Sequence, residues 1–207
     1  MKLRQILIGM AMVSLGYVSA HAVGPVPSPL IAEDKVLGEA YYDTLGILTA
    51  NNGCSEFFGG SESSIDIFNR LIERVRKDYL AVSIGIQMSG ATINAHNAKT
   101  NSRYRLFDRV SINANGPFYR KKYSDSQPTV RGVGSYQPNT REARALMLLH
   151  ELGHIVEGKS GSWLLPDDGR DAGLSQENTQ RIEDVCGNQI KGLGKGDNPQ
   201  PTVEGKP

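Results

Sequence analysis

Cysteine is scarce in this chain of 207 residues, which contains only Cys54 and Cys186. The two are far apart, so the sequence offers no Cys-x-x-Cys pair for a structural zinc site of the zinc-finger kind. In an oxidising compartment we expect them to pair with each other. The bridge would tie the N-terminal region to the last helix and close a long loop, which the chain-entropy model values at on the order of 4–5 kcal/mol.

The sequence also lacks a large excess of either charge. Removing Lys2 and Arg4, which lie in the first 22 residues, from the 23 basic residues leaves 21 against 22 acidic ones, a net charge of −1. No basic stripe is present, so nucleic acid and anionic membranes are not expected partners.

No apolar run reaches the roughly 20 residues that a transmembrane helix needs, and the longest extends only from Ile6 to Val18. This run follows a basic start and precedes Ala20-His21-Ala22, a small-residue cleavage site. The three parts predict a signal peptide over residues 1–22, with cleavage near Ala22 and a secreted or periplasmic protein. The alternative is an uncleaved membrane anchor, although nothing resembling a stop-transfer segment follows the run.

One stretch carries a clear chemical pattern, Leu148-Leu149-His150-Glu151-Leu152-Gly153-His154. On an α-helix, His150 and His154 lie about 40° apart on one face, so both imidazoles can reach one metal ion. Glu151 is too displaced to complete the coordination shell, but it can reach a water in the metal's open position. The pattern predicts a hydrolytic Zn²⁺ site with Glu151 as its general base.

The simpler alternative is a surface helix whose histidines need no metal. However, apolar residues such as Leu146, Ile155 and Val156 flank the motif and indicate a largely buried helix. Two half-buried histidines beside a carboxylate need a partner. Gly153 costs roughly 1 kcal/mol relative to alanine inside a helix, which indicates close packing against the backbone there. Both features favour the metal site.

The remaining pattern predicts a single domain of the α+β class. Helical and strand periodicities, with capping residues, predict these elements: a core helix over 61–79 capped by Ser61, strands over 80–88 and about 104–112, the metal helix from Asn139 or Thr140 to before Gly158, and a last helix from Ser175 to about Cys186. Ser89-Gly90 is expected to end the first strand, and His96 is expected in a loop outside the site.

The ends and one internal stretch lack a clear periodicity. Prolines predict an extended arm over 23–36, and the Gly, Pro and Lys content of 188–207 predicts a disordered tail, so the domain spans 37–187. The stretch 117–139 could lie extended and pair with a substrate peptide, or form an ordinary surface loop. Its Tyr119, Tyr123 and Tyr136 could each supply a phenol to an oxyanion, and nothing selects one.

A catalytic zinc takes three protein ligands and keeps one position open, so one ligand must come from outside the motif. The candidates are acids downstream of the helix: Asp167, Asp168, Asp171, Glu177 and Glu183. Pro166 and Gly169 flank a tight turn that can aim a short carboxylate at the metal.

The His-Glu-Leu-Gly-His sequence resembles the zinc helix of the zincin metallopeptidases, and this resemblance implies a zincin-like fold and peptidase activity. Branches of the family differ in their third ligand. No histidine follows His154, which excludes the metzincin branch, and Cys54 lies in no motif of peptide deformylases. Asp168 is similar in placement to the third ligand of aspzincins, whose Gly-Thr-x-Asp signature is absent here.

Glu177 is similar in placement to the third ligand of gluzincins, but Arg181 replaces the acid usually found four residues later. We therefore predict Asp168 as the third ligand, with Glu177 as the alternative. Most of the mature chain also resembles a group of uncharacterised exported bacterial proteins, through the motifs around Cys54, the zinc helix, Pro166-Asp167-Asp168-Gly169 and Asn178-Thr179. Asn178 could orient a ligand or cap local backbone.

The function expected from the sequence is an exported zinc metallopeptidase that acts on a peptide or protein substrate. The alternative is a non-catalytic, zinc-stabilised binding protein of the cell envelope. A third possibility is a metal-free envelope protein.

Overall fold

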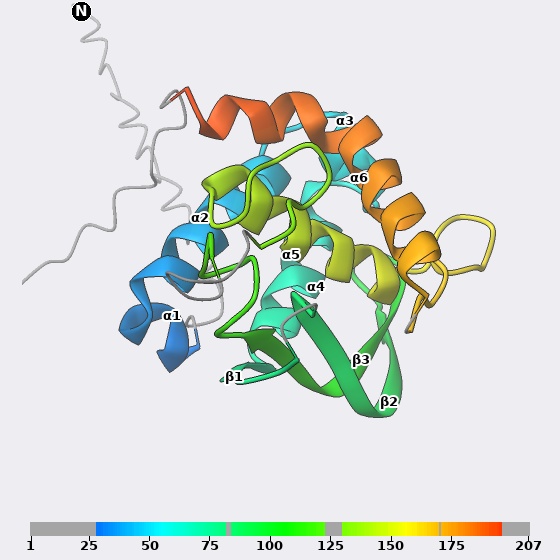
Figure 1. Cartoon of the computed structure of the whole chain (residues 1–207). Helices are drawn as coiled ribbons and strands as arrows, with labels where there is room; N and C mark the ends of the chain where they lie inside the picture. Colours follow the sequence, from blue (N-terminus) through cyan, green and yellow to red (C-terminus); the bar gives the residue numbers. More distant parts are fainter. Residues whose placement is uncertain (1–27, 82–83, 123–129, 170, 196–207) are drawn as a thin grey trace, which may run out of the picture.

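The computed structural model describes residues 28–81, 84–122, 130–169 and 171–195, and these form a mixed α+β fold, as predicted. The described residues form six helices and a small three-stranded sheet (Figure 1). In chain order they are α1 (Pro29–Glu33), α2 (Lys35–Thr49), α3 (Gly53–Phe57), α4 (Ser61–Ile72), β1 (Val75–Asp78), β2 (Ile86–Asn97), β3 (Ser102–Asn113), α5 (Arg141–Ile155) and α6 (Ala172–Leu193).

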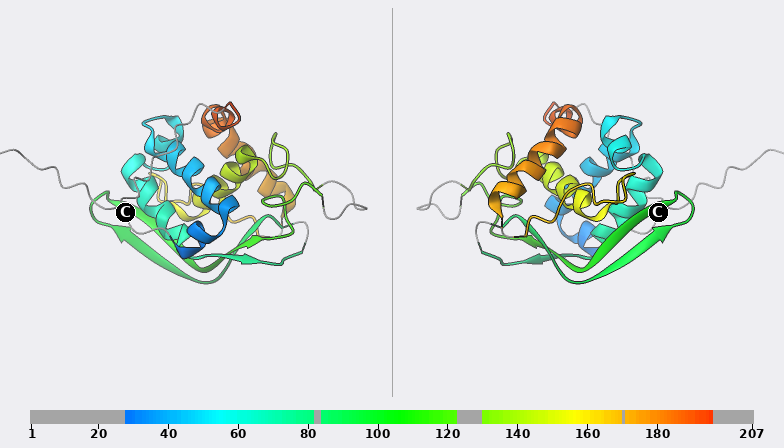
Figure 2. Two further views of the ribbon diagram at one scale, coloured as in Figure 1. Left: turned by 90° about the vertical axis from the view of Figure 1, so that its left-hand side faces the viewer. Right: turned by 90° about the vertical axis from the view of Figure 1, so that its right-hand side faces the viewer.

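The sheet lies to one side of the helices, which cover a single one of its faces (Figure 2). Its strand order is β1-β3-β2, with β1 parallel to β3 and β2 antiparallel to it. The central strand β3 carries most of the buried residues of the sheet, whereas β2 at the edge is largely exposed. The strand predicted over about 104–112 is confirmed as part of β3.

Helix α5 is the centre of the helical layer, and every residue from Ala143 to Ile155 is buried. A helix that is buried all round cannot show the one-sided pattern of a surface helix, and its leucines point into the core in every direction. Its first turn is stabilised by the side chain of Thr140, which accepts a hydrogen bond from the Ala143 amide at 3.2 Å, and by Glu142. The predicted metal helix is therefore confirmed in both position and burial.

The far end of α6 is fastened to the rest of the domain by a disulfide. Cys54 in α3 and Cys186 in α6, 132 positions apart in the sequence, are bonded with their Cα atoms 4.7 Å apart, so the predicted pairing is confirmed. Arg141, at the start of α5, adds to this anchorage because it donates to the buried Asp43 at 2.8 Å and to the Leu193 carbonyl at 3.1 Å. Helices α2, α5 and α6 are thus joined at one end of the domain.

The predicted core helix over 61–79 is correct only as far as Ile72. The residues Val75–Asp78 instead form strand β1, which pairs in parallel with Val110–Asn113 of β3. Gly60, not Ser61, occupies the N-cap position of α4. Val75 and Tyr79 fit a helical and a strand period equally well, and pairing with β3 decides between the two.

The first predicted strand was placed too early in the sequence. Strand β2 begins at Ile86, and it runs past Ser89-Gly90 to Asn97, so His96 lies in a strand and not in a loop. The register between β2 and β3 shifts between Ser89 and Thr92, and Gly90 has a positive φ of 90°. Gly90 therefore forms an irregularity within the strand and not its end, because a glycine accepts this backbone conformation at little cost.

Both predicted irregular ends contain helix. Within the predicted arm, Pro29 starts α1 and Asp34 caps α2, its carboxylate accepting from the Val36 and Leu37 amides at 3.1 Å each. Helix α6 starts earlier than predicted, because Asp171 and not Ser175 is its cap, and it continues to Leu193, with Ile190 and Leu193 buried. The predicted signal peptide and residues 23–27 and 196–207 lie outside the described residues.

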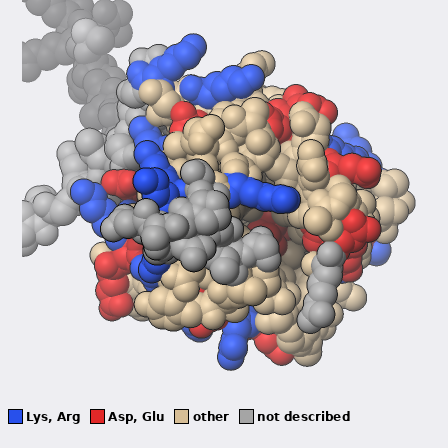
Figure 3. Space-filling view, in the orientation of Figure 1, with Lys and Arg blue, Asp and Glu red and all other residues tan. Residues whose placement is uncertain are grey.

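Within the described chain, no helix combines the length and the apolar content needed to cross a membrane. On the face shown in Figure 3, basic and acidic side chains of the described residues are interspersed.

Candidate metal centre

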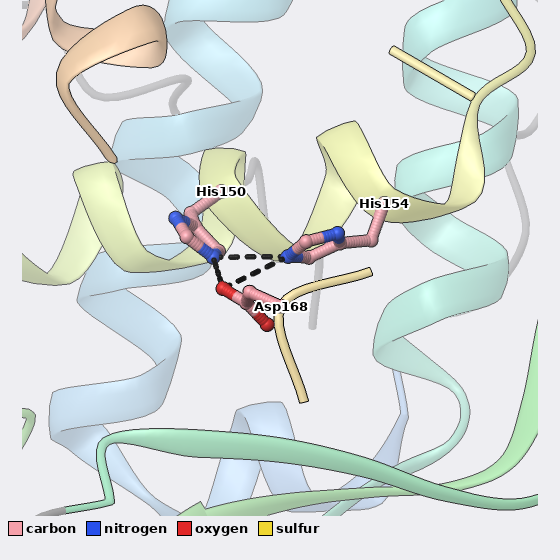
Figure 4. A group of neighbouring side chains, drawn as sticks. All are labelled: His150, His154 and Asp168. Atoms are coloured by element: carbon pink, nitrogen blue, oxygen red, sulfur yellow. Dashed lines mark hydrogen bonds and ion pairs between the residues drawn. The ribbon is translucent and has the colours of Figure 1, made fainter. Parts of the chain in front are cut away.

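Three potential metal ligands converge at the C-terminal half of α5. The Nε2 atoms of His150 and His154 lie 3.0 Å apart, and one carboxylate oxygen of Asp168 lies 3.2 Å from the first and 3.5 Å from the second (Figure 4). Both histidines are buried, and the Asp168 side chain is 18% exposed. Asp168 comes from the loop between α5 and α6, so the site joins a rigid helix to a loop.

The dimensions of this triangle fit a small metal ion. In a tetrahedral zinc site with zinc–nitrogen distances of about 2.0–2.1 Å, two ligand atoms are separated by about 3.3 Å. The three observed separations, 3.0, 3.2 and 3.5 Å, bracket that value. Two imidazoles and one carboxylate are also a ligand set that zinc accepts, and they would occupy three of its four positions. The cluster could therefore hold a metal ion such as zinc.

Gly153 lets the loop that carries Asp168 approach the helix. A Cβ atom at this position would lie 2.6 Å from Cδ1 of Leu165, closer than side chains tolerate. The Leu165 amide also donates to the Gly153 carbonyl at 3.0 Å. The close packing that the sequence predicted at Gly153 is therefore confirmed, and its consequence is that the chain can turn back toward the histidines within a few residues.

Arg105 of β3 holds the helix and the loop together. Its Nε donates to the His154 carbonyl at 2.8 Å, and its terminal nitrogens form a two-pronged ion pair with Asp167, one arm of which is 3.1 Å long. Trp163 stacks on the guanidinium, whose carbon lies 4.5 Å from the ring centre. A planar guanidinium suits this role because its donors are held in a fixed fork. Arg105 thus contacts the backbone of one candidate ligand and the neighbour of another.

Helix α6 contributes two further contacts through adjacent residues. Asn178, which is buried, donates to the Pro166 carbonyl at 3.0 Å and so holds the start of the loop that presents Asp168. Of the two roles that the sequence left open for Asn178, this contact supports the positioning of the ligand loop. Next to it, the Thr179 hydroxyl lies 3.0 Å from Nδ1 of His150.

Electrostatics favour a charged carboxylate at Asp168. Burial by itself would raise the pKa of Asp168, but its close contacts with the imidazoles of His150 and His154 outweigh burial and lower it. For His154, burial alone would lower the pKa, but the hydrogen bond with Asp168 and the charge of Glu151 raise it. The carboxylate is therefore in the ionised form that a metal ligand requires.

Glu151 lies beside the cluster without belonging to it. The residue is 9% exposed, and it is not one of the three residues of the cluster. Burial raises the pKa of Glu151, while the imidazoles of His150 and His154 lower it in part. A carboxylate with a raised pKa is a stronger proton acceptor, which is the property a general base needs.

The other candidate acids lie elsewhere. Glu177 is exposed on α6 and is not part of the cluster, whereas Asp168, the favoured candidate, is. Asp167 pairs with Arg105, Asp171 caps α6, and Glu183 accepts from the Ser135 amide at 3.0 Å. The structure therefore brings together His150, His154 and Asp168.

The tyrosines proposed to stabilise an oxyanion have other contacts. Tyr119 donates to Asp34 at 3.0 Å, and the Tyr136 hydroxyl lies 3.5 Å from the Gly187 carbonyl. Burial raises the pKa of Tyr136 to about 12. Neither hydroxyl contacts the His-His-Asp cluster, and Tyr123 lies outside the described residues.

The stretch 117–139, for which the sequence left open an extended segment or a surface loop, is partly a tight turn. Val133 and Tyr136 exchange hydrogen bonds of 3.0 Å, and Gly134 between them has a φ of 55°. The turn packs on Glu183 of α6. Residues 133–136 therefore present no extended edge, while 123–129 of the same stretch are outside the described residues.

The sequence did not reveal the contacts made by Arg105 and Thr179. An arginine among the apolar residues of a predicted strand was a usable signal, since a buried charge needs a partner. For Thr179, the signal was its place next to Asn178 in the motif before Cys186.

We compared the chain with models of known protein families, with curated proteins and with solved structures, and none of the three comparisons gave a match.

Proposed function

We propose that the protein is an exported, zinc-dependent hydrolase, and that it acts as a metallopeptidase of the zincin type. The observation that carries the proposal is the triangle formed by His150, His154 and Asp168, with Glu151 beside it. Three protein ligands leave one position of a tetrahedral zinc open, as in catalytic sites, whereas structural zinc sites are closed by four. This count favours the enzyme over a binding protein that uses zinc only for stability.

A zinc ion at this site would polarise a substrate carbonyl and lower the pKa of a water molecule toward 7. Glu151 accepts a proton from the attacking water, and its burial increases its basicity for this step. It then delivers that proton to the leaving amine. Asp168 and the two imidazoles would hold the ion, and Arg105 fixes the position of the Asp168 loop relative to helix α5.

We include export in the proposal because a disulfide and a signal peptide are both typical of exported proteins. Disulfides persist in oxidising compartments, and the bond between Cys54 and Cys186 is present in the structure.

The test is a Glu151→Gln variant, which keeps the shape of the side chain and removes its basicity. We expect the variant to bind one zinc per chain as the wild type does, and to lose hydrolysis of a broad peptide library by at least about 100-fold, the lower end of general-base contributions. Glu177→Gln makes the same chemical change on the exposed face of α6 and should leave both zinc content and hydrolysis unchanged. Hydrolysis that survives Glu151→Gln would refute the proposed mechanism.

A further inference from the structure

Thr179 of α6 is placed between the backbone of its own helix and one of the candidate ligands. Its hydroxyl donates to the Ser175 carbonyl, one turn earlier, at 2.8 Å. The same oxygen lies 3.0 Å from Nδ1 of His150 on α5. A threonine that bonds to the carbonyl four residues earlier is common in helices, but the second contact reaches a different helix, 29 residues away in sequence.

The protons around this hydroxyl can be assigned by counting donors. A hydroxyl has one proton and two lone pairs. Because the proton of Thr179 is used in the bond to Ser175, the oxygen can only accept from His150. The proton of the neutral His150 ring is therefore on Nδ1, and Nε2 carries a lone pair.

Nε2 of His150 faces the other two candidate ligands. It lies 3.0 Å from Nε2 of His154 and 3.2 Å from a carboxylate oxygen of Asp168. With the proton on Nδ1, His150 presents the Nε2 lone pair to the position that the three ligand atoms share, as metal binding requires.

We propose that Thr179 is a positioning residue that keeps the His150 imidazole in the Nδ1–H form, with the Nε2 lone pair directed at the metal position. The consequence is an unequal pair of ligands. His150 is preorganised by α6, whereas His154 is held through its backbone carbonyl by Arg105. A histidine ligand is commonly oriented by a partner at its second nitrogen, and losing that partner typically reduces metal affinity 10–100-fold.

The contribution of Thr179 to metal affinity rests on the proposed function, whereas the position of the proton on His150 can be tested without any metal. The primary test is therefore made on the metal-free, full-length protein labelled with ¹⁵N. Long-range ¹H–¹⁵N spectra recorded at alkaline pH distinguish the two neutral tautomers of His150. We expect the Nδ1–H form in the wild type and in Thr179→Ser, which keeps the hydroxyl.

In Thr179→Val, which keeps the shape and removes the hydroxyl, we expect the His150 population to shift to the Nε2–H form. A wild-type His150 in the Nε2–H form, or a Thr179→Val spectrum with the wild-type tautomer, would overturn the proposal. If the valine variant does not fold, as judged by circular dichroism, the wild-type spectrum alone still decides the assignment.

The second readout is the affinity for Zn²⁺ alone, measured by competition with a chelator. Thr179→Val should bind zinc about 10–100-fold more weakly than the wild type, and Thr179→Ser should retain wild-type affinity. An equal affinity of all three proteins would contradict a positioning role. Absence of zinc binding even in the wild type would refute the proposed function, while the tautomer measurement would still stand. If the wild type binds zinc and hydrolyses peptides but the His150 tautomer is the same with and without the Thr179 hydroxyl, only this inference is refuted.

Discussion

The two ends of α6 are held by different kinds of contact. The first turns begin at the Asp171 cap and contact the candidate metal centre and its loop through two polar side chains: Asn178 donates to the Pro166 carbonyl, and Thr179 contacts His150. The last turns, from Cys186 to Leu193, are held by a disulfide and by buried apolar residues. The N-terminal end of α6 thus positions residues of the candidate metal centre, and the C-terminal end anchors the helix to the rest of the domain.

This difference separates stability from metal binding within a single helix. Burial of apolar area and a disulfide contribute several kilocalories per mole, whereas individual polar contacts contribute about 1 kcal/mol each. Substitutions at the anchored end should therefore reduce stability and preserve the site. Substitutions near the metal centre should weaken metal binding and leave the stability of the metal-free protein nearly unchanged.

The largest effect is expected from removal of the disulfide. Cys54→Ser combined with Cys186→Ser should lower the free energy of unfolding by about 2–5 kcal/mol, because the unfolded chain loses a long-range constraint. Denaturant unfolding of the metal-free protein measures this change. Zinc affinity under native conditions should stay at the wild-type value, and a variant that lost its zinc affinity while folded would show that the two ends are not separate.

Asp168→Asn should have the next largest effect, at the opposite end of the helix. The amide removes the charge of the third ligand, so zinc affinity should fall by at least about 100-fold, or about 3 kcal/mol, the upper end of what outer-sphere contacts contribute. The midpoint of unfolding of the metal-free protein should change little. Chelator competition measures the affinity, with Glu177→Gln as the control. If Glu177→Gln weakened binding and Asp168→Asn did not, the assignment of the third ligand would be wrong.

Gly153→Ala should have a smaller effect, and it should change both the stability of the protein and its zinc affinity. The new Cβ would lie 2.6 Å from Leu165, and the crowding costs about 1–3 kcal/mol, against about 1 kcal/mol gained in helix propensity. Displacing Leu165 should also displace Asp168, three residues later, and weaken zinc binding. Thermal unfolding and chelator competition measure the two effects.

Gly192→Ala is the matched control for Gly153→Ala. Apart from its own helical turn, no atom of the described residues lies within 4 Å of its added Cβ, so the variant should be neutral or more stable by up to about 1 kcal/mol. Equal behaviour of the two variants would argue against close packing at Gly153 as the cause.

The sequence was sufficient to predict the helix of the site because its signals are local. Thr140 caps it, apolar residues surround it, and the spacing of His150 and His154 places both on one face. The disulfide was predictable for another reason, since the chain holds only two cysteines.

Local signals favoured Asp168 over Glu177 but did not decide between them. The return of the loop depends on Leu165 packing on Gly153 and on Arg105, which lies 62 residues before its partner Asp167. The boundary between α4 and β1 was missed for the same reason, because pairing of Val75 with Val110 overrides a spacing that also fits a helix.

The central claim is that His150, His154 and Asp168 bind one zinc and leave a position open for the reaction. X-ray absorption spectroscopy on the dialysed, zinc-loaded protein tests this most directly, together with its metal content. The account predicts one zinc per chain, two imidazole nitrogens at about 2.0–2.1 Å, one carboxylate oxygen and a solvent molecule in the remaining position. A chain that retains no stoichiometric zinc, or a shell closed by four protein ligands, would contradict it.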